Sequence, residues 1–204
     1  MKITIFDSEY LSLSKKKSNL KSLIKFKKKL FPEIIQISFL KCSNIYLKNN
    51  QKKLNIFIKI KQKLPNRIKK LTKITSNILK KKGYFFKTSM SLIDKFIDDK
   101  SILIANGEDL KILKLNIKYN NLNKRNKKSV YFVNLKKILN KINKNQNHDT
   151  ENLNKIFKFK INFDPHNSSN DCIILYRTIK KLIKILGKEK FKYIISKNKQ
   201  LFTF

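Results

Sequence analysis

Residues 54–92 constrain the fold of this chain most, because their pattern predicts a strand, a helix and a second extended segment. From Leu54 to Lys61 an apolar residue occupies every second position, the pattern of a strand with one apolar face. Pro65 follows at the expected start of a helix, where proline removes no backbone hydrogen bond. Apolar residues then recur at helical spacing, and Gly83 is placed to end the helix in a left-handed cap. Tyr84–Phe86 restart an extended segment, so the stretch is predicted to be a β-α-β unit.

The chain is strongly basic, with 49 Lys and Arg residues against 13 Asp and Glu and a formal net charge of +36. A compact protein with this charge repels itself unless a polyanion lies nearby, so a nucleic acid is the expected partner. Lysine, asparagine and isoleucine dominate whereas glycine and tryptophan are scarce, a bias typical of AT-rich genomes such as those of organelles. Codon composition therefore accounts for part of the lysine excess.

Membrane insertion and disulfide chemistry are not expected. No run of about 18 uncharged apolar residues exists, so no transmembrane helix is predicted. The first residues include Asp7 and Glu9 and lack a presequence or signal-peptide core, which indicates a cytosolic protein or one made inside its organelle. Cys42 and Cys172 lie far apart without a CxxC pair and are predicted to be buried, reduced thiols.

Residues 1–53 are predicted to be an extension. Residues 1–6 alternate like a short strand, and residues 15–30 form a basic run compatible with a helix. Residues 34–47 are apolar enough to pack and fit either a pair of strands or a buried helix. A polar junction at residues 49–53 marks the expected boundary.

The middle of the chain is predicted to hold a long basic hairpin. Residues 110–118 alternate like a strand, and residues 130–135 are β-branched and aromatic like a returning strand. The tip between them is rich in asparagine and lysine, and we expect it to touch phosphates. Residues 94–109, which carry most of the acidic residues of this region, are interpreted as an insertion in the arm formed by residues 84–135.

The last quarter of the chain is predicted to be mainly helical. Asp149 or Thr150 can cap a short helix that ends near Phe157, and residues 159–163 alternate like a final strand. Apolar residues at helical spacing over residues 173–186 predict a helix that ends at Gly187, with a further short helix after it.

This order of elements is that of a ferredoxin-like sheet with two helices on one face. IFIKIK at residues 56–61, then Pro65 and the helix to KKKG at residues 80–83, resembles the first strand and helix of the small-subunit ribosomal protein S-ten family. Lys124–Ser129 with VYFVNLKKIL, and TENLNKIFKFKINF at Thr150–Phe163, look similar to the basic tip and the closing helix and strand of that family. The resemblance covers residues 54–164, although the family's prolines after the glycine are absent.

The resemblance implies an α+β fold: a ferredoxin-like split βαβ sheet, a long protruding basic β-hairpin, and mainly helical N- and C-terminal extensions. It divides the chain into an extension (1–53), a domain that binds ribosomal RNA (54–164) and a helical extension (165–204). It implies a structural, non-catalytic constituent of a mitochondrial small ribosomal subunit, with a plastid-type organelle as the alternative. The expected partners are small-subunit rRNA and neighbouring ribosomal proteins of the subunit head, without a cofactor, a metal or a small-molecule substrate. Expected RNA contacts come from Lys59, Lys61, Arg67, Lys87, Lys118, Tyr119, Asn120, Asn121, Asn123, Lys124, Arg125, Asn126, Lys127 and Lys128.

Three alternatives remain open. Another rRNA-binding protein is suggested by a faint likeness to the S-eight family at residues 78–83, whose Ser-rich C-terminal loop is not found. A membrane-surface protein would use the amphipathic helices. A basic RNA-processing enzyme would need clustered carboxylates or a paired histidine. His148 and His166 are predicted to be solvated loop residues, and the acidic residues Asp98, Asp99, Glu108 and Asp109 are predicted to form salt bridges rather than a metal site.

Overall fold

A mixed six-stranded sheet lies at the centre of the computed structural model, which describes residues 2–11, 31–42, 46, 51–122, 128–160 and 166–203. The strand order is β3-β2-β1-β4-β5-β6. β1 pairs in parallel with β4, and β4 with β5, whereas β2, β3 and β6 join by antiparallel pairing. The strands are β1 (Ile3–Tyr10), β2 (Ile34–Cys42), β3 (Gln51–Phe57), β4 (Ile102–Ala105), β5 (Ser129–Asn134) and β6 (Gln200–Thr203).

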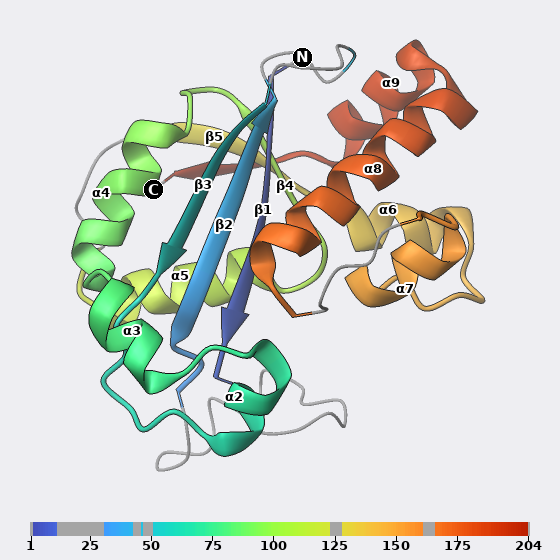
Figure 1. Cartoon of the computed structure of the whole chain (residues 1–204). Helices are drawn as coiled ribbons and strands as arrows, with labels where there is room; N and C mark the ends of the chain where they lie inside the picture. Colours follow the sequence, from blue (N-terminus) through green and yellow to red (C-terminus); the bar gives the residue numbers. More distant parts are fainter. Residues whose placement is uncertain are drawn as a thin grey trace.

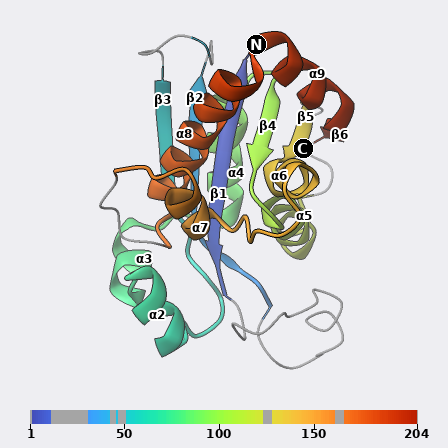
Figure 2. The same cartoon turned by 90° about the vertical axis from the view of Figure 1, so that its right-hand side faces the viewer.

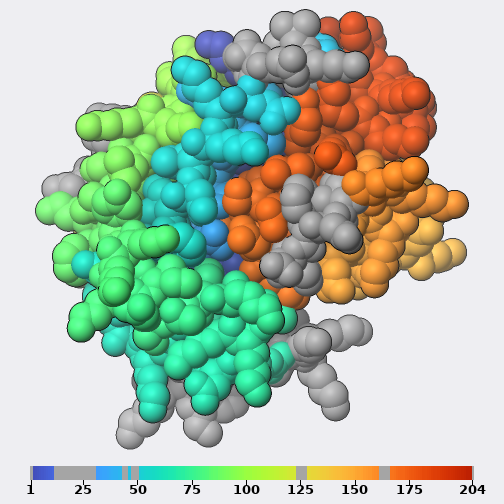
Figure 3. All heavy atoms as spheres, in the orientation of Figure 1, coloured from blue at the N-terminus to red at the C-terminus, as the bar shows by residue number. Residues whose placement is uncertain are grey.

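Helices cover both faces of the sheet (Figures 1 and 2). α4 (Phe86–Phe96) and α5 (Asp109–Tyr119) lie on one face. The opposite face carries α6 (Leu135–Ile142), α7 (Thr150–Ile156), α8 (Ser168–Leu186) and α9 (Lys188–Asn198). Two short helices, α2 (Asn66–Thr72) and α3 (Ser76–Lys82), lie below the edge at which β1 and β3 end, and they form a bulge at that end of the molecule in Figure 3.

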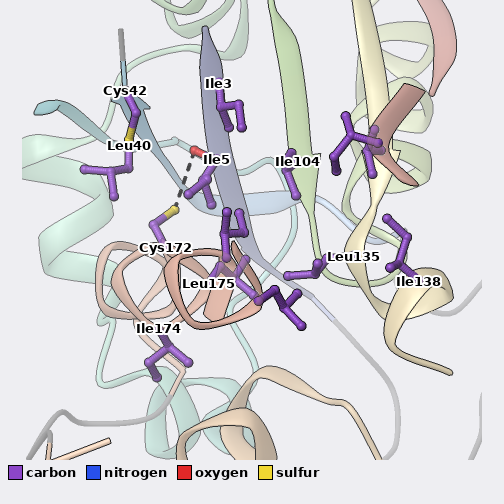
Figure 4. Close-up of a cluster of buried hydrophobic side chains, with 14 of the residues drawn as sticks. Ile3, Ile5, Leu40, Cys42, Ile104, Leu135, Ile138, Cys172, Ile174 and Leu175 are labelled. Carbon is purple, nitrogen blue, oxygen red and sulfur yellow. Dashed lines mark hydrogen bonds between the residues drawn. The ribbon is translucent and has the colours of Figure 1, made fainter. Parts of the chain in front are cut away.

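Alternation along β1 divides the core into two layers. Ile3 and Ile5 face α8, whereas Phe6 faces the other way and stacks on Phe39 of β2 with ring centroids 5.5 Å apart. Figure 4 shows the first layer, where residues of β1, β2 and β4 meet Cys172 and Leu175 of α8. Each fully buried aliphatic side chain contributes about 1.5–3 kcal/mol, so α8 is held firmly against the strands.

The predicted ferredoxin-like fold is wrong. Residues 110–118 form most of helix α5, because Leu110, Leu113 and Asn116 share a buried helical face although the same segment also alternates. Residues 84–92 lead into and form helix α4 rather than a strand. The predicted insertion holds β4, which pairs in parallel with β1 near the centre of the sheet. The described residues on either side of the expected tip therefore do not pair as a hairpin: residues 109–119 are helical, and β5 pairs with β4 and β6.

The predicted helical N-terminal extension is also wrong in the part that is described, because it contributes β1 and β2. Strands from all three predicted segments join the same sheet. The basic run at residues 15–30 lies outside the described residues, as do residues 161–163 of the expected last strand. None of the described helices is long and apolar enough to cross a membrane.

Several local predictions are confirmed. β3 and the bridge at Ile58 occupy the predicted first strand, Pro65 precedes the first helical residue, and α8 ends at Gly187 with φ +79°. The predicted helix before Gly83 is divided, since Lys73 has φ 60° and separates α2 from α3. Gly83 ends α3 as expected but has φ −80°, so its cap is not left-handed.

Candidate active site

Four acidic side chains converge at the edge of the sheet where the parallel strands β1 and β4 end. Asp7 and Glu9 lie in β1, Asp109 is the first residue of α5, and Asp171 lies in the first turn of α8. One ligand atom from each of Asp7, Glu9 and Asp171 lies within 4.8 Å of the other two. Open α/β sheets bind ligands outside the carboxyl ends of their strands, and the cluster occupies that position.

The strand period of two explains why Asp7 and Glu9 point together. They lie on the same face of β1 as Ile3 and Ile5, which pack against α8. Ser8 points to the opposite face, where α5 begins. β1 therefore presents two carboxylates to α8 and one hydroxyl to α5.

Asp109 is held in place by hydrogen bonds from β1. The Ser8 backbone N–H and the Ser8 hydroxyl both donate to Asp109 Oδ1, at 3.0 and 2.7 Å. The preceding loop is anchored as well, because Asn134 Nδ2 donates to the Gly107 carbonyl at 2.7 Å and Asn106 Nδ2 donates to the His148 carbonyl at 2.8 Å. These bonds place the start of α5 beside the end of β1.

Asp171 is positioned by the way α8 begins. The Asn167 side chain caps the helix by accepting a hydrogen bond from the Ser169 N–H at 3.1 Å. Ser168 Oγ and Ser38 Oγ share a hydrogen bond of 2.7 Å, which ties the first turn of α8 to β2. Asp171 consequently faces the two carboxylates of β1.

Burial, and then mutual repulsion, raises the pKa values of these acids. Burial, together with repulsion from Asp109 and Asp171, raises the pKa of Asp7 well above its ordinary value. Burial and repulsion from Asp171 raise the pKa of Glu9 to about 8, and burial and repulsion from Asp109 raise that of Asp171 to about 7. Burial raises the pKa of Asp109 to about 6, against an opposing effect of the hydrogen bonds from Ser8.

The cluster fits a divalent cation. Within the described part of the chain, none of the four carboxylates forms a salt bridge. Buried carboxylates are stable only when they are paired, protonated or coordinated to a metal. Mg²⁺ and Mn²⁺ prefer carboxylate oxygens, and oxygens within roughly 5 Å of one another can share one such ion. Asp7, Glu9 and Asp171 meet this requirement, and Asp109 lies beside them.

The cluster opens into a pocket of about 410 Å³, here called the acidic pocket. Ile68 and Leu71 of α2 form an apolar part of its wall, and His166 lines it just before α8, with φ 59°. Lys136, at the start of α6, is the one lysine or arginine among the described residues that line this pocket, and it forms an ion pair with Asp149. The pocket therefore combines acids, one histidine, one cation and an apolar wall.

The predicted RNA-contacting residues lie elsewhere. Lys59, Lys61, Lys87 and Asn120 line a different pocket, on the α4–α5 side of the sheet, with Tyr119 beside it. Three others are exposed, Arg67 on α2 and Lys118 and Asn121 at the end of α5. Lys128 donates to the backbone carbonyl of Ile97 at 2.8 Å and pairs with Asp94 at 3.7 Å. Asn123, Lys124, Arg125, Asn126 and Lys127 lie outside the described residues.

Sequence reasoning missed the acidic pocket, although one signal was present. Asp7 and Glu9 continue the apolar alternation of Ile3 and Ile5, and acids on the buried face of a strand require an explanation. Asp98 and Glu108 do form the predicted salt bridges, with Lys41 and Lys111. The salt bridge predicted for Asp109 does not form among the described residues; Asp109 accepts hydrogen bonds from Ser8 and lines the acidic pocket.

Comparisons with known proteins agree with this site. A family model described as Exonuclease (RNase_T) matches residues 4–179. The nuclease domain of 3′hExo, a DEDDh family member bound to rAMP, is similar with a TM-score of 0.69 and 16% identity, covering 90% of this chain and 92% of that one. Cell-death related nuclease 4 (CRN-4) has a TM-score of 0.67 and 14% identity, covering 100% of this chain and 80% of that one. No curated protein sequence matches.

A third similar structure is exonuclease X in complex with 5′ overhanging duplex DNA, with a TM-score of 0.62 and 12% identity over 95% of this chain and 99% of that one. These structures identify the mixed sheet with its helices as an exonuclease-like fold of the RNase H type. The predicted S-ten relationship, ribosomal role, ribosomal partners and lack of enzymatic activity are therefore wrong. The resemblance rested on a local strand–helix unit and lysine-rich segments, which recur in unrelated basic proteins.

Proposed function

Because this chain belongs to the exonuclease family whose model spans residues 4–179, we propose that it is a metal-dependent exonuclease that removes nucleotides from the 3′ ends of nucleic acids. The observation that carries the proposal is the meeting of Asp7, Glu9 and Asp171 within 4.8 Å, with Asp109 beside them. Two similar structures support the 3′ direction, since their descriptions name a 3′-exonuclease. This proposal replaces the expectation that the protein has no metal.

Asp7, Glu9, Asp109 and Asp171 would hold the divalent cations. Bound cations supply charge neutralisation at the scissile phosphate and lower the pKa of a water molecule. Two of these carboxylates are positioned by hydrogen bonds: Ser8 donates two to Asp109, and the bond between Ser38 and Ser168 anchors the turn of α8 that carries Asp171. Five of the residues that line this pocket also agree with the letters of DEDDh, the family named for 3′hExo: Asp7, Glu9, Asp109, Asp171 and His166.

His166 is the residue placed to accept a proton. It lines the acidic pocket, and a neutral imidazole can take a proton from water near neutral pH. In the proposed hydrolysis the water oxygen bonds to phosphorus, and one water proton passes to His166. The bond from phosphorus to the 3′ oxygen breaks, and that oxygen takes a proton from solvent to become the new 3′ hydroxyl. The products are a nucleoside 5′-monophosphate and a strand shortened at its 3′ end.

The remaining walls suit the terminal nucleotide. Leu71, which is partly exposed, offers an apolar surface for a base, and Lys136 offers a cation for a phosphate. The net charge of +36 attracts the polyanionic strand towards a pocket that is itself acidic. Bound metal cations would neutralise the carboxylates of the pocket, so that these no longer repel the phosphates of the strand.

The test uses the full chain with single-stranded RNA and DNA labelled at the 5′ end, in the presence of Mg²⁺ or Mn²⁺. We expect a ladder of labelled products shortened from the 3′ end, with EDTA abolishing it. Asp7→Asn and Asp171→Asn should each reduce the rate by roughly 100-fold or more, since each removes charge that the metal requires. His166→Ala should reduce the rate by about 100-fold.

Asp99→Asn is the matched control, because Asp99 is an exposed aspartate that does not line the pocket. It should leave the rate within about twofold of the unsubstituted chain. Release of labelled mononucleotide from the 5′ end, or full activity of Asp7→Asn, would refute the proposed reaction.

A further inference from the structure

A second pocket lies on the α4–α5 side of the sheet, and its charge is opposite to that of the acidic pocket. It has a volume of about 230 Å³ and is formed by the segment after β3, the start of α4 and the end of α5. The exposed lysines Lys59, Lys61 and Lys87 line it. Among the described residues, Glu33 is the one acid that lines it, and Glu33 is buried and accepts a hydrogen bond from the Lys61 backbone N–H at 2.8 Å. We call it the basic pocket.

Aromatic rings accompany the lysines of the basic pocket. Phe85 is 67% exposed, and Lys59 Nζ lies 4.9 Å from its ring centroid. Tyr119 stacks on Phe31 with centroids 4.1 Å apart, and Lys61 Nζ lies 4.8 Å from the Tyr119 centroid. The exposed Phe85 ring, with cations beside it at the mouth of a pocket, offers a flat stacking surface to an anionic ligand.

Single-stranded nucleic acid matches both features of this surface. Bases stack on exposed aromatic rings, which contributes about 1–3 kcal/mol per base, and phosphates pair with neighbouring lysines. An acidic peptide would use the lysines but would leave the Phe85 ring without a partner. A neutral apolar ligand would leave three cations without a role. The net charge of +36 further favours a polyanion.

The basic pocket is separate from the catalytic residues. Asp109 begins α5 and Tyr119 ends it, so the helical rise places these two residues roughly 15 Å apart. The residues that line the basic pocket do not line the acidic one. Loss of binding at one pocket is thus distinguishable from loss of chemistry at the other.

We propose that the basic pocket is a second, non-catalytic binding site for single-stranded nucleic acid. A base stacks on Phe85, and phosphates contact Lys59, Lys61 and Lys87. Three of the lysines expected from the sequence to contact RNA are thereby brought into one site. The proposal does not depend on the proposed hydrolysis, because it uses none of the acidic residues.

Binding is measured on the full chain in EDTA, so that no strand is cleaved. The probes are fluorescently labelled oligouridylate and oligothymidylate of about 12 nucleotides, followed by anisotropy. The double variant with Lys59→Ala and Phe85→Ala should bind both probes roughly 10-fold more weakly, because a stacking partner and a phosphate partner are lost. Both side chains are exposed, so the fold should persist, as circular dichroism will show.

The chain offers a matched control on α9. Tyr193 is 62% exposed, and Lys197 Nζ lies 5.7 Å from its ring centroid. The double variant with Tyr193→Ala and Lys197→Ala removes the same charge and the same kind of ring pair away from any pocket described above. It should change the affinity by less than about twofold. If the two double variants lose oligonucleotide affinity equally, the proposal is overturned. It is also overturned if neither variant loses affinity.

Two further measurements distinguish a nucleic-acid ligand from polyphosphate and from an anionic membrane. Phe85→Ala alone should weaken oligonucleotide binding but leave binding of inorganic polyphosphate unchanged, because polyphosphate has no base to stack. Equal weakening of both would overturn the stacking. If the first double variant loses binding to phosphatidylserine vesicles and keeps binding to both oligonucleotides, the pocket is a membrane site and the proposal fails.

Discussion

Ser8 donates two hydrogen bonds to one carboxylate oxygen of Asp109, from its backbone N–H at 3.0 Å and from its hydroxyl at 2.7 Å. The two residues are 101 positions apart, so the bonds join the end of β1 to the start of α5. Hydrogen bonds to the charged form lower the pKa of a carboxyl group and restrict its orientation. Ser8 therefore acts as a positioning residue for a proposed metal ligand.

Ser8→Ala should lower the exonuclease rate roughly 10-fold, the effect of losing one hydrogen bond to a charged group. Without the hydroxyl, the pKa of Asp109 should rise above its present value of about 6, so the acidic limb of the pH–rate profile should move to higher pH. The measurement is the rate across the pH range at a metal concentration below saturation, where protons compete with the metal for Asp109. Ser101→Ala, at a buried serine outside the acidic pocket, is the control. An unshifted profile in Ser8→Ala would contradict the positioning role.

Stability of the metal-free protein should fall as the pH rises. The pKa values of Glu9 and Asp171 are raised to about 8 and about 7, above those of an unfolded chain. Between about pH 4 and about pH 8 the folded state therefore binds more protons than the unfolded state, and the free energy of unfolding decreases with pH. Each kcal/mol lost lowers the Tm of a protein of this size by about 2–4 °C.

Thermal unfolding in EDTA at several pH values measures this dependence. Addition of Mn²⁺ near pH 8 should restore the Tm, because the metal binds only the folded site. Asp7→Asn should flatten the pH dependence, since it removes one of the repelling charges. A Tm that climbs towards alkaline pH without metal would mean that the carboxylates are paired within the protein.

Elements encoded by consecutive residues were predictable. β3, the start of α2 after Pro65 and the end of α8 at Gly187 follow from alternation, helical spacing and a terminating glycine. These signals act within a few residues, so no tertiary information is needed to detect them. The expected mitochondrial location rests on composition and stays a prediction.

Strand pairing and the site were not predictable in the same way. Ile3–Ile5 pair in parallel with Ile102–Ile104, and nothing near either segment specifies the other. The site assembles only when that pairing and the docking of α8 bring Asp109 and Asp171 to β1. The apolar residues of 110–118 are spaced so that they fit a strand as well as a helix. Tertiary packing selects the helix α5, which buries Leu110, Leu113 and Asn116 on one face.

Gly83→Ala should destabilise the fold by about 1–3 kcal/mol, the usual effect of overpacking. A Cβ at this position would lie 2.3 Å from the Leu79 carbonyl oxygen and 3.1 Å from the Lys59 backbone nitrogen. The strain is steric, because φ is −80° and suits any residue. Denaturant unfolding measures the change, with Lys82→Ala on the exposed side of α3 as the control. Equal stability of the two variants would show that α3 moves aside without loss.

Lys136→Met should lower kcat/KM for oligonucleotides by roughly 10-fold or more, because a charge-assisted hydrogen bond to a phosphate contributes about 1.5–3 kcal/mol. The Lys136 side chain lines the acidic pocket and is directed by Asp149, whose other oxygen accepts a hydrogen bond from Asn147 Nδ2 at 2.9 Å. Lys137→Met removes the same charge from the next residue, which is exposed and does not line the pocket, so it controls for net charge. Steady-state kinetics at matched salt concentration measures both variants. If kcat/KM falls by the same small factor in both variants, the net charge of the whole protein accounts for substrate attraction. Lys136 then makes no contact with the phosphate.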